Sequence, residues 1–179
     1  MPGREPTQRL FFALWPDVEV RAAIESIMDI LPSRGGRRVV RDNLHITVLF
    51  LGSITAQQRA CAEAVAESAA ATRFRLQLDR IGFWPKPGIL WLGAANPPQP
   101  LLGLVSYLHA GTGRCGIPLD ERPFKPHLTL WRKLRSCGPV PDLGPVTWNV
   151  TDFCLVQSVT GSDGPRYAVL RTWPLQAPP

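Results

Sequence analysis

The chain has 179 residues, of which 45% are hydrophobic, and a net charge of +6. That length suits one domain or two small packed lobes, and that apolar content excludes a largely disordered chain. No apolar run approaches the ~20 residues needed to cross a bilayer, and the first ten residues hold no signal-peptide core. We therefore expect a soluble, cytoplasmic protein without a membrane partner. The positive charge favours a polyanionic partner, although a solvated basic surface explains it about equally well.

The four cysteines form neither a zinc knuckle nor a compact disulfide framework. Cys61, Cys115, Cys137 and Cys154 include no CxxC pair and are widely spaced. Four reduced thiols in a cytosolic protein are the simplest prediction. No metal site and no other cofactor is expected.

The N-terminal half alternates strand and helix patterns. Residues 8–15 (QRLFFALW) predict a buried strand, and Asp17 is placed to cap the helix that follows. A second strand is predicted over residues 43–51, ending at Gly52. Residues 55–58 then have the spacing of a capping box. The alanine-rich helix that they open would bury a stripe of small residues, among them Cys61.

The C-terminal half is richer in strands. The pattern predicts strands over residues 74–78, 89–92, 127–131, 150–157 and 166–173, a helix over 101–108, and a loop over 82–88. The turn sequence GSDGP would join the last two strands in a hairpin. Helices and strands do not alternate strictly, so the fold class is α+β rather than a doubly wound parallel sheet.

Two of the predicted strands contain the same short motif. His45-Ile46-Thr47 and His127-Leu128-Thr129 each place a histidine and a threonine two residues apart, and the chain has only three histidines. Side chains on a strand alternate between its faces, so each histidine shares a face with its threonine. A single histidine on an apolar strand is usually a packed core residue. Two copies of one motif favour a joint chemical role instead.

Paired histidines suit the cleavage of a phosphodiester. Histidine titrates near neutral pH, so one neutral ring can take a proton from water while a second, protonated ring gives one to the leaving oxygen. Threonine hydroxyls on the same face can donate hydrogen bonds to phosphoryl oxygens. Two histidines without a carboxylate or cysteine cluster are too few ligands for a closed zinc site. No GxSxG elbow, Walker A loop or GxGxxG loop is present.

Arginines gather just before the first motif. Arg34, Arg37, Arg38 and Arg41 form a basic cluster that is either a charged loop or a contact for a phosphate backbone. Their position next to the motif slightly favours the phosphate contact. His109 is expected to lie on a helix and away from the chemistry.

Five stretches of the sequence, including both motifs, resemble those of a known family. The stretches RLFFALW, NLHITVLFLG, WLG, RPFKPHLTLWRK and YAVLRTWPL, in this order, resemble the bacterial and archaeal RNA 2′,3′-cyclic phosphodiesterases. These enzymes were first named 2′-5′ RNA ligases and belong to the 2H phosphoesterases. The resemblance covers residues 8–175.

The resemblance implies a bilobal α+β fold, in which two mainly antiparallel sheets flank a central cleft and helices lie outside. Residues 1–179 would form one domain of two pseudo-symmetric lobes, with flexible tails over 1–7 and 176–179. The implied activity is metal-independent opening of a 2′,3′-cyclic phosphate at an RNA end, leaving a 2′-phosphate. Reverse 2′-5′ ligation by the same site is implied by the older name.

Site residues follow from the resemblance. His45 would be the general acid and His127 the general base, although the two roles could be exchanged. The phosphoryl oxygens would be bound by Thr47, Thr129 and Arg132.

The roles of Arg132 and of three further residues, Tyr167, Phe50 and Trp15, are less clear from the sequence. In a regular strand Arg132 would lie on the face opposite His127, so it reaches the phosphate only if the strand ends or twists. Tyr167 could stack on a base, or it could be an ordinary strand residue. Core packing is the better prediction for Phe50, and the role of Trp15 is open.

Other functions fit the same motifs. The enzyme could act on small cyclic nucleotides or 2′-5′-linked oligoadenylates. A non-catalytic module could bind RNA ends through the cleft, but binding alone does not need two groups that transfer protons. The protein is expected to be a monomer.

Overall fold

The computed structural model describes residues 5–31, 33–161 and 164–178. Its helices are α1 (Val18–Ile30), α2 (Ala56–Glu67) and α3 (Gln99–Gly113), with a 3₁₀ turn, η1 (Arg41–Asn43). Its strands are β1 (Thr7–Leu14), β2 (Ser33–Arg34), β3 (Arg37–Arg38), β4 (Ile46–Thr55), β5 (Phe74–Leu78), β6 (Arg80–Trp84), β7 (Ile89–Gly93), β8 (His127–Arg132), β9 (Ser136–Cys137), β10 (Val146–Val150), β11 (Asp152–Gly161) and β12 (Gly164–Pro174).

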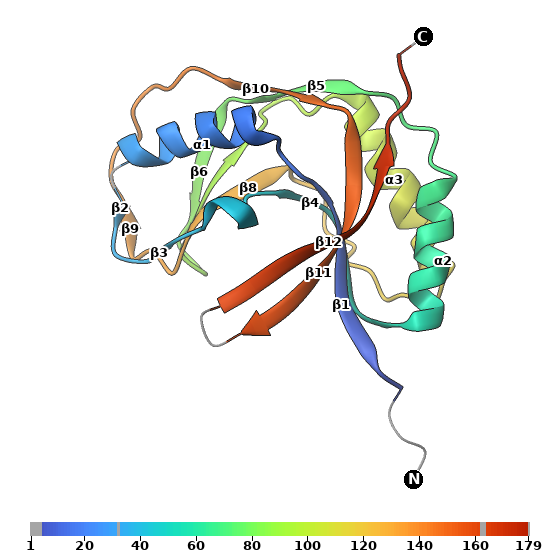
Figure 1. Cartoon of the computed structure of the whole chain (residues 1–179). Coiled ribbons are helices and arrows are strands. Elements are labelled where there is room, and N and C mark those ends of the chain that lie inside the picture. Colours follow the sequence, from blue (N-terminus) through green and yellow to red (C-terminus); the bar gives the residue numbers. More distant parts are fainter. Residues whose placement is uncertain (1–4, 32, 162–163, 179) are drawn as a thin grey trace.

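One large antiparallel sheet organises these elements. Its strand order is β12-β11-β1-β4-β8-β7-β6, and β3 also pairs with β8. Two short ribbons, β10-β5 and β2-β9, complete the strands of the described residues. α2 and α3 lie at one end of the molecule, and β2, β3 and β9 lie at the other (Figure 1). The predicted α+β class and the antiparallel pairing are confirmed.

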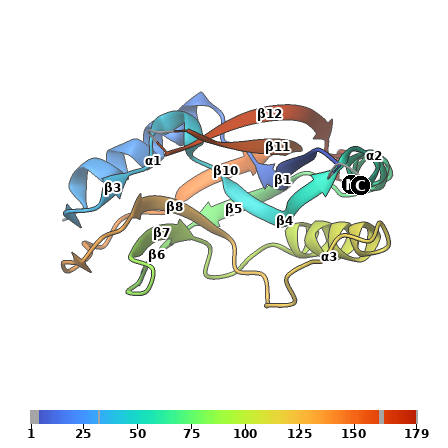
Figure 2. The same ribbon diagram turned by 90° about the horizontal axis from the view of Figure 1, so that it is seen from below.

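The large sheet has two arms that meet at β4 and β8, near its middle (Figure 2). The two strands are joined by a single antiparallel pair, Ile46 opposite Leu128. Both of these side chains are fully buried. The junction between the arms therefore lies within the two sequence motifs.

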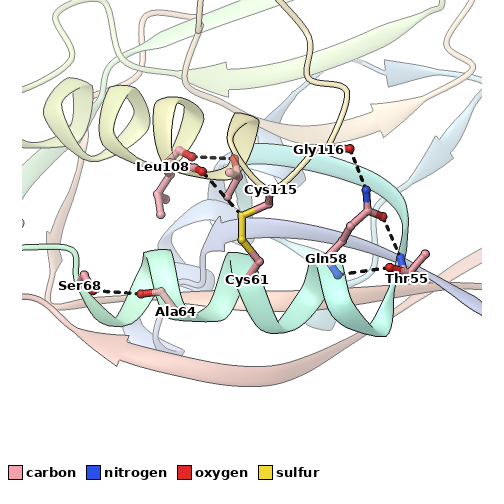
Figure 3. Close-up of a disulfide and its surroundings, with 10 residues drawn as sticks. Thr55, Gln58, Cys61, Ala64, Ser68, Leu108, Cys115 and Gly116 are labelled. Carbon is pink, nitrogen blue, oxygen red and sulfur yellow. Dashed lines mark hydrogen bonds between the residues drawn. A yellow bond between two sulfur atoms is a disulfide. The ribbon is translucent and has the colours of Figure 1, made fainter.

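The helices α1 and α2 begin at the capping residues that the sequence predicts. The Asp17 carboxylate accepts a hydrogen bond from the Val20 amide at 2.8 Å and caps α1. Thr55 and Gln58 form both hydrogen bonds of a capping box at the start of α2 (Figure 3). One face of α1 is buried, as the spacing of its apolar residues predicts: Val20, Ile24, Ile27 and Met28.

Several boundaries differ from the prediction. Gly82 lies in β6 rather than a loop, because its missing side chain leaves room for the Trp91 ring on β7; a Cβ there would be 2.1 Å from that ring. β4 continues through Gly52 to Thr55, since its residues stay paired with β1. β10 was not predicted, although Val146, Trp148 and Val150 alternate with polar residues. It follows a proline-rich stretch and pairs with β5.

Two residues that were expected in flexible tails, Thr7 and Gln176, pair with other segments of the chain. Thr7 already pairs with Thr55 in the sheet. Gln176 forms a bridge to Thr72, and its carbonyl accepts a hydrogen bond from the Arg73 amide at 2.8 Å. Residues 1–4 and 179 lie outside the described residues.

The prediction of four reduced thiols is wrong for two of them. Cys61 on α2 forms a disulfide with Cys115, just after α3 (Figure 3). Cys61 is exposed rather than part of the buried stripe, which instead contains Ala62 and Ala66. A cytoplasmic location loses the support of reduced thiols, because disulfides persist mainly in oxidising compartments.

No helix in the described part of the chain is both long enough and apolar enough to cross a membrane.

Candidate active site

The two motifs lie side by side. Because Ile46 is opposite Leu128 in an antiparallel pair, the same register sets His45 opposite Thr129 and His127 opposite Thr47. Directly opposed side chains on neighbouring strands are about 5 Å apart at Cβ, and diagonal ones are about 7–8 Å apart. Continued from this single pair, the register directs each histidine toward the threonine of the other motif and places the two histidines on a diagonal.

Both histidine rings are held in the same way. Nδ1 of His45 lies 2.7 Å from the carbonyl oxygen of Asn43, and Nδ1 of His127 lies 2.8 Å from that of Lys125. A carbonyl only accepts hydrogen bonds, so Nδ1 carries the hydrogen in each ring. This leaves Nε2 of each ring to accept a proton when neutral, or to donate one when the ring is charged.

Aromatic rings enclose the two histidines. The Trp15 ring stacks on His45 at 5.4 Å between centroids, and Tyr167 meets the same imidazole edge-on at 5.0 Å. Trp84 meets His127 edge-on at 4.8 Å. These contacts exclude water from one side of each imidazole and restrict its orientation.

Burial and nearby positive charge lower the pKa of both histidines. Burial is the main cause for His45 and takes its pKa to about 4, opposed by the Asn43 hydrogen bond and supported by the charges of Arg132 and His127. The pKa of His127 is also lowered, first by burial and then by Arg132, against the Lys125 hydrogen bond. Both rings are therefore neutral at pH 7 in the free protein.

A β-bulge brings Arg132 to the same side as the histidines. Thr129 pairs with Trp91 and Trp131 pairs with Leu90, so Leu130 is an extra residue in β8. Leu130 and Trp131 are both buried, which breaks the alternation of the strand. The bulge therefore reverses the face on which Arg132 lies, a bend in the strand that its residue pattern does not reveal.

The first motif contains the same bulge. Thr47 pairs with Ala13 and Leu49 pairs with Phe12, so Val48 is the extra residue in β4. Phe50 is thus the counterpart of Arg132. The prediction that Phe50 packs in the core is wrong, since it is 41% exposed and the Arg9 guanidinium lies 4.7 Å from its ring.

A pocket of about 400 Å³ opens in front of these residues. Its lining includes His45, Thr129, Arg132 and Tyr167, all of which the sequence predicted for the site. Thr47 and His127 are half-buried beside it, on the facing motif positions. Arg37, Arg38 and Arg166 add positive charge to the wall, which makes the pocket suited to an anion.

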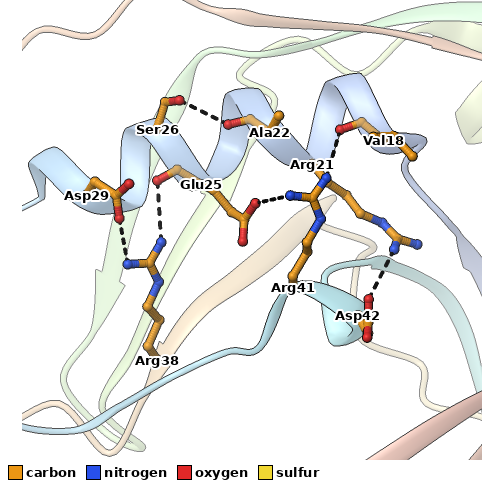
Figure 4. A network of polar contacts seen from close by, with 9 residues as sticks. All are labelled: Val18, Arg21, Ala22, Glu25, Ser26, Asp29, Arg38, Arg41 and Asp42. Carbon is orange, nitrogen blue, oxygen red and sulfur yellow. Dashed lines mark hydrogen bonds and ion pairs between the residues drawn. The ribbon is translucent and has the colours of Figure 1, made fainter.

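The basic cluster divides into two groups. Arg38 and Arg41 form ion pairs with Asp29 and Glu25 on α1, at 2.6 and 2.7 Å (Figure 4). These pairs hold the segment before the first motif against the helix. Arg38 also lines the pocket, and Arg37 lines both this pocket and the hollow beside it. The side chain of Arg34 lies outside the described residues.

Two site residues were not predicted from the sequence. Asn43 holds His45 with its carbonyl and donates from its amide to the Pro165 carbonyl at 3.0 Å, which ties the first motif to β12. Trp84 lies in the segment expected to be a loop, so no strand pattern placed it near His127. Its only signal was an aromatic side chain in a glycine- and proline-rich stretch.

Among the described residues, no group of three histidine, cysteine, aspartate or glutamate side chains could hold a metal ion. His109 lies on α3, with Nε2 3.3 Å from the Asp120 carbonyl oxygen, and does not line the pocket.

Comparison with known proteins agrees with this geometry. Residues 16–161 match the sequence model of the 2′-5′ RNA ligase superfamily, and this span includes both motifs. The chain belongs to this superfamily. The predicted family resemblance is confirmed.

Members of the 2′-5′ RNA ligase superfamily from distant organisms are similar along nearly the whole chain. The RNA 2′,3′-cyclic phosphodiesterase of Escherichia coli is 35% identical and covers 94% of this chain, which spans 97% of that protein. The enzyme of the same name from Thermus thermophilus is 34% identical, with 94% and 90% covered.

Solved structures of the superfamily share the fold. E. coli LigT without ligand superimposes with a TM-score of 0.86 at 33% identity, covering 96% of this chain and 99% of LigT. LigT complexed with 3′-AMP gives a TM-score of 0.87 at 34% identity, with 94% and 98% covered. A relative of this fold therefore holds a nucleotide with a 3′-phosphate.

Proposed function

We propose that this protein hydrolyses the 2′,3′-cyclic phosphate at the end of an RNA strand and leaves a 2′-phosphate. One observation carries the proposal: two carbonyl-anchored histidines, His45 just before β4 and His127 at the start of β8, flank the pair that joins these strands, beside a cationic pocket lined by His45, Thr129 and Arg132. The relatives named RNA 2′,3′-cyclic phosphodiesterase support the choice of substrate.

The reaction needs one proton taken and one given. His127, neutral, accepts a proton from water at Nε2 as the water oxygen bonds to phosphorus. His45, protonated, donates its Nε2 proton to the 3′ oxygen as the bond from phosphorus to that oxygen breaks. This assignment of the two roles is the one that the family resemblance implies. Both proton transfers are made by side chains of this chain.

The remaining side chains hold the phosphate and the nucleoside. Thr47 and Thr129 donate hydrogen bonds to the non-bridging oxygens, and Arg132 balances the charge that develops on them. Burial lowers the pKa of both histidines, and a bound anion opposes that effect by favouring the charged ring. The substrate therefore helps to protonate its own general acid. Tyr167 contacts the terminal nucleoside beside His45.

With another nucleophile the same ring opening is a 2′-5′ ligation. A 5′-hydroxyl in place of water would open the cyclic phosphate with the same two proton transfers. The superfamily's name favours this second activity.

The test is an oligoribonucleotide with a 2′,3′-cyclic end, incubated with EDTA present and followed by mass spectrometry and by end-specific phosphatase digestion. The expected product carries one added water and a 2′-phosphate. His45→Ala and His127→Ala should each lower kcat by about 10²–10⁴-fold, whereas His109→Ala should not. A panel with 2′-5′-linked oligoadenylate and small cyclic nucleotides separates the alternative substrates. Binding without turnover would leave a non-catalytic module as the function.

A further inference from the structure

A second basic hollow lies next to the pocket. It has a volume of about 680 Å³ and is lined by Gly35, Gly36, Arg37, Lys133, Arg135 and Ser136. Arg37 also lines the pocket that contains His45, so the two spaces adjoin at this side chain. Arg37 extends across to the β11–β12 hairpin, where a Cβ on Gly164 would lie 2.9 Å from its guanidinium.

The backbone around the hollow is closely packed. Gly36 has a φ of +76°, and a Cβ there would lie 2.8 Å from the Arg132 carbonyl oxygen. Lys133 has a φ of +57°, a conformation uncommon for residues other than glycine. The next residue, Leu134, donates its amide to the Gly88 carbonyl at 2.9 Å. These contacts hold the segment with Arg37 and the segment with Lys133 and Arg135 in fixed positions relative to Arg132.

The described lining of the hollow is rich in positive charge and contains no carboxylate. Lys133 and Arg135 are exposed, and among the described residues neither forms an ion pair. Arg38 and Arg41, a few residues from Arg37, are paired with carboxylates on α1. Among the described residues that line the hollow none is aromatic, so they offer no surface on which a base could stack. Its chemistry fits a phosphate group.

We propose that this hollow binds the phosphodiester on the 5′ side of the terminal nucleotide of a single-stranded RNA. The inference rests on the proposed function, in which the reacting phosphate lies between the two histidines. The next phosphate along the strand would then reach the hollow past Arg37. Lys133 and Arg135 make the protein prefer an RNA end over a free cyclic mononucleotide, which has no second phosphate.

The experiment compares two substrates: a nucleoside 2′,3′-cyclic monophosphate, and a trinucleotide with the same cyclic end. The double variant Lys133→Asn/Arg135→Gln removes both charges, and asparagine tolerates the positive φ of position 133. The trinucleotide KM should rise by about three- to tenfold with kcat nearly unchanged. The mononucleotide KM should stay the same. Arg114→Gln is the control, because Arg114 is an exposed cation at the C-cap of α3. α3 lies at the other end of the molecule (Figure 1).

Salt dependence gives an independent readout. The slope of log KM for the trinucleotide against log salt should become shallower by about 0.7 for each lost phosphate contact. Equal effects of the double variant on both substrates, or none on either, would overturn the inference while leaving the proposed function intact. If the wild type turned over neither substrate, the proposed function itself would fail.

Discussion

At the residue scale, the lowered pKa values of the histidines determine how activity depends on pH. The mechanism needs one charged and one neutral ring, and forms with a single proton on the pair are most populated between the two pKa values. The assigned roles place that proton on His45, the ring whose pKa is lowered further, so only a minor part of the singly protonated free protein is in the active form. The pKa of His45 is about 4 and that of His127 lies below 6.5 in the free protein. We expect kcat/KM, measured from pH 4 to 9, to peak below pH 6.5 and then to fall about tenfold per pH unit.

Arg132 provides the control for this profile. Its charge lowers the pKa of both histidines, so Arg132→Gln should move both limbs of the profile to higher pH. Arg132→Lys keeps the charge and should leave the limbs in place, although it loses the planar fork that suits phosphate oxygens. Limbs that do not move in Arg132→Gln would show that this charge does not act on the histidines.

Residue pattern alone was enough to predict that the two H-x-T motifs act together, and the structure sets these motifs side by side. Only three histidines exist, two share one motif, and strand alternation fixes which side chains accompany them. Arg132 could not be placed in this way, because an alternating pattern assumes a regular strand. The bulge at Leu130 is a property of pairing with β7, which lies in another part of the sequence.

At the element scale, both motif strands have an extra residue directly after the threonine. Val48 and Leu130 take equivalent places, so each strand bends at the same distance from its histidine. The bend exposes Phe50 in one motif and turns Arg132 toward the pocket in the other. The two motif strands therefore share a backbone geometry, but the residues that follow the H-x-T motif differ: Arg132 lines the pocket and Phe50 does not.

A substitution at Gly36, just before β3, tests whether the close contact between this segment and β8 positions Arg132. Its Cβ would lie 2.8 Å from the Arg132 carbonyl oxygen, so Gly36→Ala should displace β8 near Arg132. We expect kcat/KM to fall several-fold and the free energy of unfolding to fall by more than the ~1 kcal/mol of a left-handed alanine. Steady-state kinetics and urea unfolding measure the two effects.

Gly35→Ala is the matched substitution. Gly35 has nearly the same φ, +74°, but a Cβ there would meet nothing within 4 Å. It should cost only the backbone strain and leave kcat/KM unchanged for a nucleoside 2′,3′-cyclic monophosphate, which does not reach the hollow that Gly35 lines. Equal effects of the two variants would mean that the close approach to β8 is unimportant.

At the scale of the whole molecule, the disulfide ties two helices that neither line the pocket nor pair in the sheet. Cys61 and Cys115 are separated by 54 residues, so the bond restricts a long loop of the unfolded chain. Reduction should lower the free energy of unfolding by up to about 4 kcal/mol and leave kcat/KM unchanged. Urea unfolding with and without reductant measures this.

Serine variants separate this bond from the free thiols. The double variant Cys61→Ser/Cys115→Ser should be as unstable as the reduced wild type and insensitive to reductant. Cys137→Ser should behave as the wild type in both conditions. If reductant destabilised the double serine variant as well, another group would be responsible.

The overall architecture was predictable only in part. Strong periodicity and caps located the three helices and most strands, because these signals are local. The pairing of β10 with β5, of β3 with β8, and of Cys61 with Cys115 depends on residues far apart in the chain. No pattern within either partner indicates such a contact. A proline-rich segment then suggests a loop, and an isolated cysteine suggests a free thiol.

His45 also links the site to the stability of the whole fold. Its pKa is about 4 when folded and 6.5 when unfolded, so between these values the unfolded chain binds more protons. The free energy of unfolding must therefore fall as the pH falls through this window. Between pH 7.5 and 4.5 we expect His45 to account for a loss of about 2–3 kcal/mol. Urea unfolding at both pH values should show this loss in the wild type and in His109→Gln. The loss should be correspondingly smaller in His45→Gln, and an equal loss in all three proteins would contradict a buried neutral ring at position 45.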